Sequence, residues 1–128
     1  MTTSRAPISW QQLPHAPEAG TCIGNLHQLA DGQAIGTRGA FPVLLLRSGD
    51  TVFAYANRCP HFGVPLSSEQ GLLHQKAHES ISCSVHLAKF RWTDGRCTWG
   101  DCEGEFLSVI PVEVDFDGDG AIRIKKTI

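Results

Sequence analysis

The clearest pattern in the chain is the alternation of apolar and polar positions in short runs that end at turn residues. In FPVLLLRSGDTVFAYAN, residues 43–47 are apolar up to the final Arg47, residues 48–50 are typical of a turn, and residues 51–56 alternate again. This spacing predicts two antiparallel strands joined by a tight turn. Side chains of the second strand are expected to alternate between two faces, with Val52, Ala54 and Ala56 on one face and Phe53 and Tyr55 on the other.

Similar short runs occur along the rest of the chain, and none has the sustained 3.6-residue period of a long helix. We expect a strand of mixed polarity over 21–29, a short strand over 80–83, and two hairpins with turns at 94–95 and 117–120. The polar segment 68–79 is predicted to be an insertion with room for one helical turn. The pattern indicates an all-β fold, a small antiparallel sandwich or barrel.

Length and charge narrow the possible partners. The chain has 128 residues, which suits a single domain over 1–128 that buries a core without disulfides. Its net charge of −2 gives no field that would favour nucleic acid or a membrane surface. No apolar run approaches the roughly 20 residues of a membrane-spanning helix. The first residues lack the apolar stretch of a secretion signal, so the sequence predicts a cytoplasmic location.

The candidate chemistry lies in two short motifs, Cys59-Pro60-His61 and Cys83-Ser84-Val85-His86. Each follows a predicted strand and contains one cysteine and one histidine. Five cysteines in a chain without an export signal favour thiols or metal ligands over a disulfide framework. Buried cysteines with surface histidines are one interpretation, and a tetrahedral zinc site is another. Zinc sites of this composition usually keep Cys with Cys and His with His, so the mixed pairs favour a site with two inequivalent metals.

The two motifs, C-x-H and C-x-x-H, resemble those of the Rieske family of iron–sulfur proteins. The neighbouring Phe62-Gly63 and Pro65-Leu66 are similar to the family's first loop, and the resemblance extends from about Phe41 to the C-terminus. It implies a small β domain with a two-loop subdomain, about residues 57–105, that binds one [2Fe-2S] cluster.

The resemblance also assigns the cluster ligands, with Cys59 and Cys83 on one iron and His61 and His86 on the other. The implied function is a one-electron carrier, not an enzyme, that takes electrons from a reductase and passes them to a terminal oxygenase or similar enzyme. The sequence shows no nucleophile–base pair, phosphate loop or facial triad that would indicate catalysis. Two alternatives remain: a small or regulatory subunit of an oxidoreductase such as nitrite reductase, and a zinc-stapled β domain with an interaction role.

The chain departs from high-potential members of the family at positions that affect the cluster. Val64 and Val85 stand where those members carry two bridged cysteines, so no bridge is expected. Ala88 and Phe90 stand where those members carry Ser and Tyr hydroxyls, and neither side chain can donate a hydrogen bond. Loss of these donors disfavours the more negative reduced state, so we expect a potential near the low end of the Rieske range, roughly −150 mV.

The residues after the second motif are candidates for partner contact. Lys89 and Arg91 share a predicted strand face, which is either a solvated face or a docking patch for an acidic partner. Trp92 and Trp99 flank the hairpin turn at 94–95, and both are expected to be packing anchors.

The other cysteines and histidines have less specific patterns. Cys97 and Cys102 are expected to be reduced thiols, with a redox role across a bend as the alternative. Cys22 is expected to pack as a small residue in a strand. His74 and His78 lie in the polar insertion, where we expect solvated side chains, with a secondary metal role as the alternative.

Overall fold

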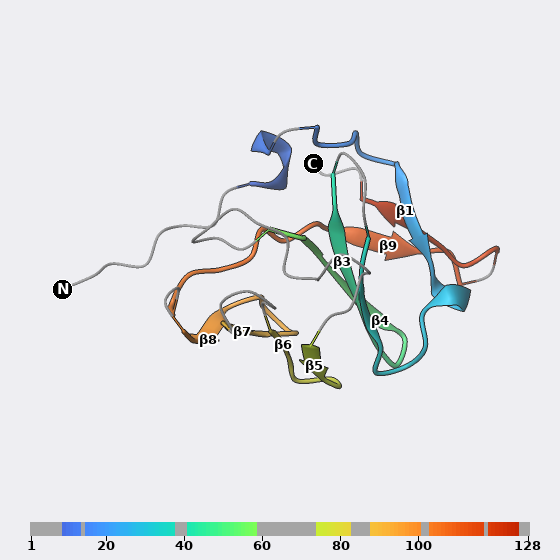
Figure 1. The fold of residues 1–128 in the computed structure, drawn as a ribbon. Coiled ribbons are helices and arrows are strands. Elements are labelled where there is room, and N and C mark those ends of the chain that lie inside the picture. Colours follow the sequence, from blue (N-terminus) through green and yellow to red (C-terminus); the bar gives the residue numbers. More distant parts are fainter. Residues whose placement is uncertain are drawn as a thin grey trace.

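The computed structural model of the chain describes residues 9–13, 15–37, 41–58, 74–82, 88–100, 103–116 and 118–125. Within these ranges ten strands form three antiparallel sheets, and the helices are two short 3₁₀ turns, η1 (Trp10–Gln12) and η2 (Leu26–Gln28) (Figure 1). In this part of the chain no helix has the length and apolar character needed to cross a membrane. Because the described residues form strands and two short 3₁₀ turns, the predicted all-β class is confirmed.

The central sheet has the order β2-β3-β4. Its strands are β2 (Ala34–Gly36), β3 (Val43–Ser48) and β4 (Thr51–Ala56). The β3–β4 hairpin confirms the prediction, and pairing of Ser48 with Thr51 shortens its turn to Gly49 and Asp50. Gly49 adopts a left-handed φ of 62°, which a glycine accepts without steric cost.

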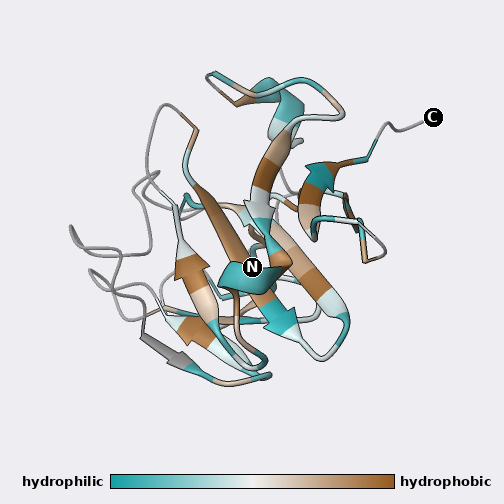
Figure 2. Ribbon diagram, turned by 90° about the vertical axis from the view of Figure 1, so that its right-hand side faces the viewer, coloured by the Kyte–Doolittle hydropathy of each residue, from teal (hydrophilic) through white to brown (hydrophobic). Residues whose placement is uncertain are grey.

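The two faces of the central sheet enter two different cores, as the alternation predicted. One face carries Leu44, Leu46 and Tyr55, and the other carries Val43, Leu45 and Ala54. The hydrophobic residues lie mainly in the strands (Figure 2). Since another sheet covers each face, β3 reads as a continuous apolar run instead of an alternating one.

A second sheet has the order β1-β10-β9 and packs on one side of the central sheet. Its strands are β1 (Cys22–Asn25), β9 (Val112–Val114) and β10 (Ala121–Ile124). The last hairpin is confirmed, but the strand expected over 21–29 ends at Asn25. The Asn25 side chain accepts a hydrogen bond from His27 N and donates one to Asp119 O, both at 2.8 Å. This cap begins η2 and so stops the strand.

The third sheet has the order β5-β6-β7-β8 and lies on the opposite side of β3 and β4 from β1 and β9 (Figure 1). Its strands are β5 (His74–Lys76), β6 (Ser80–Ser82), β7 (Lys89–Arg91) and β8 (Cys97–Trp99). The strand predicted at 80–83 is confirmed over Ser80–Ser82, with Cys83 outside the described residues, and the hairpin around 94–95 is confirmed. The described part of the insertion forms β5 and a turn closed by Glu79 N donating to Lys76 O (3.0 Å), so the expected helical turn is wrong there.

The segment 105–110 joins the third sheet to the central one. Cys97 N donates to Glu105 O at 2.7 Å, beside the β7–β8 hairpin. A few residues later, Ile110 N donates to Ala54 O at 2.8 Å on β4. The hairpin is therefore held against β4 by backbone hydrogen bonds as well as by the core.

Candidate metal centre

The four predicted ligands, Cys59, His61, Cys83 and His86, lie outside the described residues. The structure describes the strands that flank them. We call residues 59–73 the first motif segment and residues 83–87 the second motif segment. Within the described ranges, no group of three or more His, Cys, Asp or Glu side chains could hold a metal ion.

The strand that follows the first motif segment and the two strands that flank the second lie side by side in the β5–β8 sheet. His74 follows the first motif segment, Ser82 precedes the second, and Lys89 begins the strand after it. The register pairs His74 with Ser82 and Ser82 with Lys89. Adjacent strands lie about 5 Å apart, so these three chain ends are close neighbours. The residue that follows the first motif segment therefore lies beside the residue that precedes the second.

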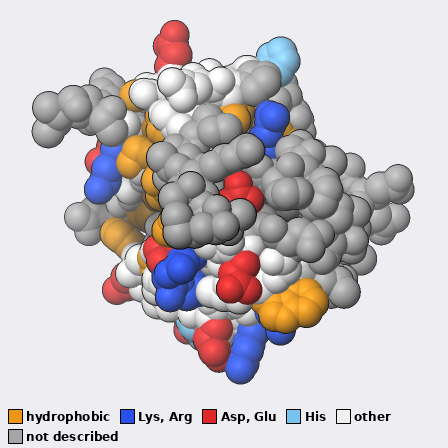
Figure 3. Space-filling view, turned by 90° about the vertical axis from the view of Figure 1, so that its left-hand side faces the viewer, with side chains coloured by type: hydrophobic (Ala, Val, Ile, Leu, Met, Phe, Trp, Pro, Cys, Tyr) orange, Lys and Arg blue, Asp and Glu red, His pale blue; other side chains and the backbone are white. Residues whose placement is uncertain are grey.

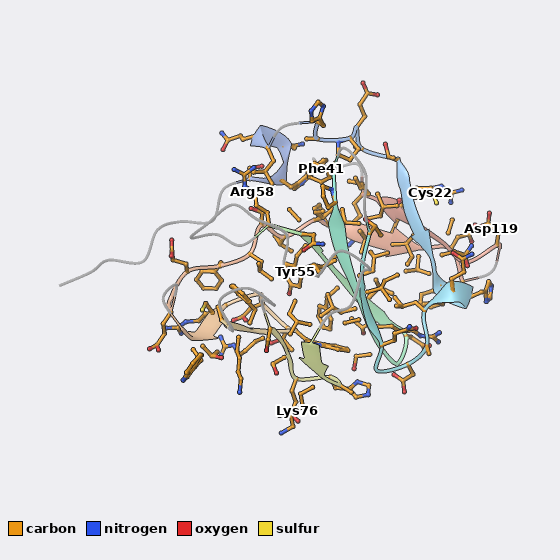
Figure 4. All side chains as sticks on the ribbon, in the orientation of Figure 1. Cys22, Phe41, Tyr55, Arg58, Lys76 and Asp119 are labelled. Carbon is orange, nitrogen blue, oxygen red and sulfur yellow. The ribbon has the colours of Figure 1, made fainter. Side chains whose placement is uncertain are left out.

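Strand β4, which leads into the first motif segment, is tied to the same region by Tyr55. The Tyr55 hydroxyl donates a 2.5 Å hydrogen bond to the backbone carbonyl of Trp92, the residue after β7. Figure 4 shows Tyr55 in the interior of the molecule, between the sheets. Beyond β4, the buried Asn57 donates its backbone N–H to Pro42 O at 2.9 Å. The first motif segment therefore begins from a fixed strand end.

An apolar core lies beneath the segment ends. Ile81 stands two residues before Cys83, and Ala88 stands two residues after His86. Together with Phe90, these residues are at most 1% exposed and belong to one core cluster. The residues on both sides of the second motif segment are therefore anchored in a core that solvent does not reach. Neither Ala88 nor Phe90 has a hydroxyl group.

Gly100 contacts Ala88 from strand β8's end. Gly100 has a φ of 108°, and a Cβ placed on it would lie 3.0 Å from Ala88 Cα and 3.1 Å from Ala88 Cβ. No side chain fits at Gly100 unless the backbone of Ala88 moves. The close backbone approach therefore fixes the residue that follows the second motif segment.

Burial and an ion pair shift the pKa values of Tyr55 and Asp94, two groups near this region. Burial raises the pKa of Tyr55 above its usual value, and the Asp94 carboxylate raises it further. The Tyr55 hydroxyl therefore keeps its proton and its bond to Trp92. The side-chain hydrogen bond from Arg91 holds the pKa of Asp94 below its ordinary value, aided by Arg96 and opposed by partial burial. Arg91 Nε lies 3.1 Å from Asp94 Oδ1.

The predicted strand face after the second motif is confirmed in part. Lys89 and Arg91 are both exposed on either side of buried Phe90. Trp92 is a buried anchor, as predicted, but the same prediction for Trp99 is wrong, because Trp99 is 55% exposed.

A register shift in strand β8 explains the orientation of Trp99. Cys97 pairs with Phe90, but Trp99, not Thr98, pairs with Lys89. The extra residue is a β-bulge, which turns Trp99 outward beside Lys89.

The remaining thiols and histidines have mixed outcomes. Cys97 is a buried, reduced thiol, as expected, while Cys102 lies outside the described residues. Cys22 was expected to pack but is exposed, since its side chain faces outward on the edge strand β1 (Figure 4). His78 is exposed, as predicted, although its Nδ1 lies 2.8 Å from Ser48 Oγ. The prediction for the His74 side chain lies outside what the structure describes.

The sequence pattern does not single out Tyr55, Asn57 or Gly100 as supports of the site. Asn57 carries a weak signal, since it is a polar residue placed between an apolar strand and the first motif. Tyr55 and Gly100 act through Trp92 and Ala88, which are distant in sequence. Local pattern therefore gives no indication of these contacts.

Comparison with known proteins gives a consistent assignment. The family model of the Rieske [2Fe-2S] domain matches residues 20–114. The solved ferredoxin of carbazole 1,9a-dioxygenase from Nocardioides aromaticivorans IC177 is 24% identical with a TM-score of 0.65, over 86% of this chain and 100% of that one. The terminal oxygenase of carbazole 1,9a-dioxygenase from Novosphingobium sp. KA1 is 22% identical with a TM-score of 0.66, over 84% of this chain and 29% of that one. A search of curated proteins finds no match.

The donor set fits the group that the family carries. Two cysteines and two histidines, one of each in each motif, are a donor set that fits a [2Fe-2S] cluster with one iron bound by sulfur and one by nitrogen. The family match includes both motifs and most of the chain. The chain belongs to the Rieske [2Fe-2S] domain family, whose members carry one such cluster per domain.

Proposed function

We propose that the chain is a one-electron carrier, not an enzyme. In this proposal Cys59 and Cys83 bind one iron of the [2Fe-2S] cluster, and His61 and His86 bind the other. When bound, such a cluster takes up and releases one electron at a higher potential than a cluster held by four cysteines. The two-loop subdomain spans about residues 57–105 within a single domain over 1–128.

The observation that carries this proposal is the pairing of the strand that follows the first motif segment with the strand that precedes the second. His74 pairs with Ser82, and Ser82 pairs with Lys89, which follows the second motif segment. This arrangement of the flanking strands supports a site to which both motifs contribute.

The surroundings of the second motif segment support a low potential within the family. Ala88 and Phe90 exclude water from its base and offer no hydroxyl to a cluster sulfur or a ligand. A reduced cluster carries more negative charge and is stabilised by such donors. Their lack supports a potential near the low end of the Rieske range, about −150 mV.

The structural relatives support a terminal oxygenase as one partner, and the family resemblance of the sequence adds a reductase as the other. One relative is named as the ferredoxin of carbazole 1,9a-dioxygenase, and it is matched over its full length. Another solved structure is described as the reduced complex between oxygenase and ferredoxin in the same system. By analogy, this chain would accept electrons from a reductase and deliver them to a terminal oxygenase or similar enzyme in the cytoplasm.

Metal content and colour test the proposal. Purified protein should be red-brown, contain iron and acid-labile sulfide in equal amounts, and give the electron paramagnetic resonance signal of a reduced Rieske cluster. Cys83→Ala should lose the cluster, and the exposed His27→Ala should keep it. A colourless protein with one bound zinc would instead support the zinc-stapled β domain and overturn the carrier function.

A further inference from the structure

An exposed tryptophan and an exposed lysine stand side by side next to the second motif segment. We infer that these two residues, the Lys89–Trp99 patch, form the surface on which a protein redox partner docks. The partner would present carboxylates to Lys89 and an apolar recess to the indole of Trp99. This inference rests on the proposed carrier function, because it assigns the side from which the cluster is approached.

The position of Trp99 is set by the backbone. The bulge in β8 turns Trp99 to the outer face, where it pairs with Lys89. The next residue, Gly100, is held against Ala88 by their close backbone approach. Strand β8 therefore presents a large aromatic side chain that is 55% exposed. Exposed aromatic side chains on a rigid support are typical centres of protein interfaces.

The basic residues on this sheet differ in whether a carboxylate is paired with them. Strands β5 and β7 carry Lys76, Lys89 and Arg91. Lys76 is paired with Glu79 at 3.3 Å, and Arg91 is paired with Asp94.

For Lys89, no carboxylate among the described residues lies within 4.0 Å of the ammonium group. Among the described residues of these strands, the positive charge without a carboxylate within 4.0 Å therefore lies on Lys89, beside the second motif segment. This occurs on a chain whose net charge is −2.

The location of the patch suits electron transfer. Lys89 is three residues after His86, and Trp99 lies across from it on the neighbouring strand. The side of the molecule on which β8 lies carries hydrophobic, basic and acidic side chains together at the surface (Figure 3). An apolar centre with charges around it is the usual composition of an interface, in which the charges steer the encounter.

An electrode with a defined surface can stand in for the partner. The holoprotein would be adsorbed on gold coated with a mixed layer of carboxylate-ended and methyl-ended alkanethiols, and its interfacial electron-transfer rate measured by voltammetry. Lys89→Glu and Trp99→Ala should each lower the rate about tenfold at low salt. The effect of Lys89→Glu should shrink as salt is raised, because the attraction is screened.

Two matched variants control for charge and for loss of an aromatic group. Lys76→Glu makes the same charge change on the same sheet, away from the patch, as Figure 4 shows for Lys76 at the outer edge. Phe116→Ala removes an aromatic side chain that is 53% exposed, after β9 in another sheet. Both variants should keep the wild-type rate.

The visible spectrum of each variant shows whether the cluster is present. It therefore distinguishes failure of the docking inference from failure of the carrier function. If all proteins carry the cluster but the controls lose as much rate as Lys89→Glu and Trp99→Ala, or no variant changes the rate, the docking inference is wrong and the carrier function stands. If only one patch variant changes the rate, the two-part patch is wrong. If wild-type protein carries no cluster, the carrier function fails and the inference fails with it.

Discussion

Tyr55 offers a quantitative test of how the strand before the first motif segment is held. Tyr55→Phe removes the hydroxyl that donates a 2.5 Å hydrogen bond to the carbonyl of Trp92. The side chain is 1% exposed, so no water can replace the lost donor without rearrangement. A buried acceptor left without a partner costs about 1–3 kcal/mol, and we expect the free energy of unfolding to fall by that amount.

The pH dependence of stability provides a second signature of the same group. Burial raises the pKa of Tyr55 in the folded protein, whereas in the unfolded chain it ionises near its ordinary value of about 10. The stabilising contribution is therefore fully present below about pH 10 and is lost as the pH rises above it. Between about pH 9 and pH 11, wild-type protein should lose about 1.4 kcal/mol more stability than Tyr55→Phe.

Urea unfolding of both proteins at the two pH values measures this difference, with visible absorbance recorded to show that the cluster persists. The chain contains one tyrosine, so the near-ultraviolet absorbance of tyrosinate reports Tyr55 alone. Tyrosinate appearing in folded protein near the ordinary pKa would refute the reasoning. Parallel loss of stability in the two proteins would refute it as well.

Three further predictions concern the supports of the site. Ala88→Ser should raise the reduction potential by about 40 mV in voltammetry if a new hydrogen bond strengthens by about 1 kcal/mol on reduction; a fall in potential would contradict this. Gly100→Ala should alter the paramagnetic resonance spectrum and destabilise the protein more than Gly49→Ala, since both have positive φ but a Cβ meets nothing within 4 Å at Gly49; equal effects would remove the role of the close approach. In the wild-type protein the hairpin should lose stability as the pH falls through the lowered pKa of Asp94, because protonated Asp94 no longer pairs with Arg91. Amide exchange should show no such loss in Asp94→Asn, and the same acid profile in both proteins would argue against this pair.

The supports described above suggest how a small β domain holds its two motif segments. The first motif segment follows β4, which the Tyr55 hydrogen bond ties to Trp92. The second motif segment is flanked by β6 and β7. Paired strand ends and a shared core limit the movement of these entry points. A carrier benefits from such rigidity, because ligands that stay in place lower the reorganisation that accompanies a change of charge.

The sequence by itself determined the hairpin over 43–56, the alternation of its faces and the all-β class. These features depend on neighbours a few residues apart, so turn residues and period-two patterns carry the information. The two motifs are likewise local patterns, and they indicate the family without any tertiary contact. Their ligand assignment is a prediction from that resemblance.

Only the tertiary structure decided where β1 ends, which way Trp99 faces and why position 100 is glycine. Asn25 caps η2 by accepting from His27 N, and its side chain is held there by donating to the backbone carbonyl of Asp119, 94 residues away. Trp99 faces outward because of a bulge relative to β7, and Gly100 fits against Ala88. Such features arise from contacts between distant segments, and a local pattern holds no information about a partner that only folding brings close.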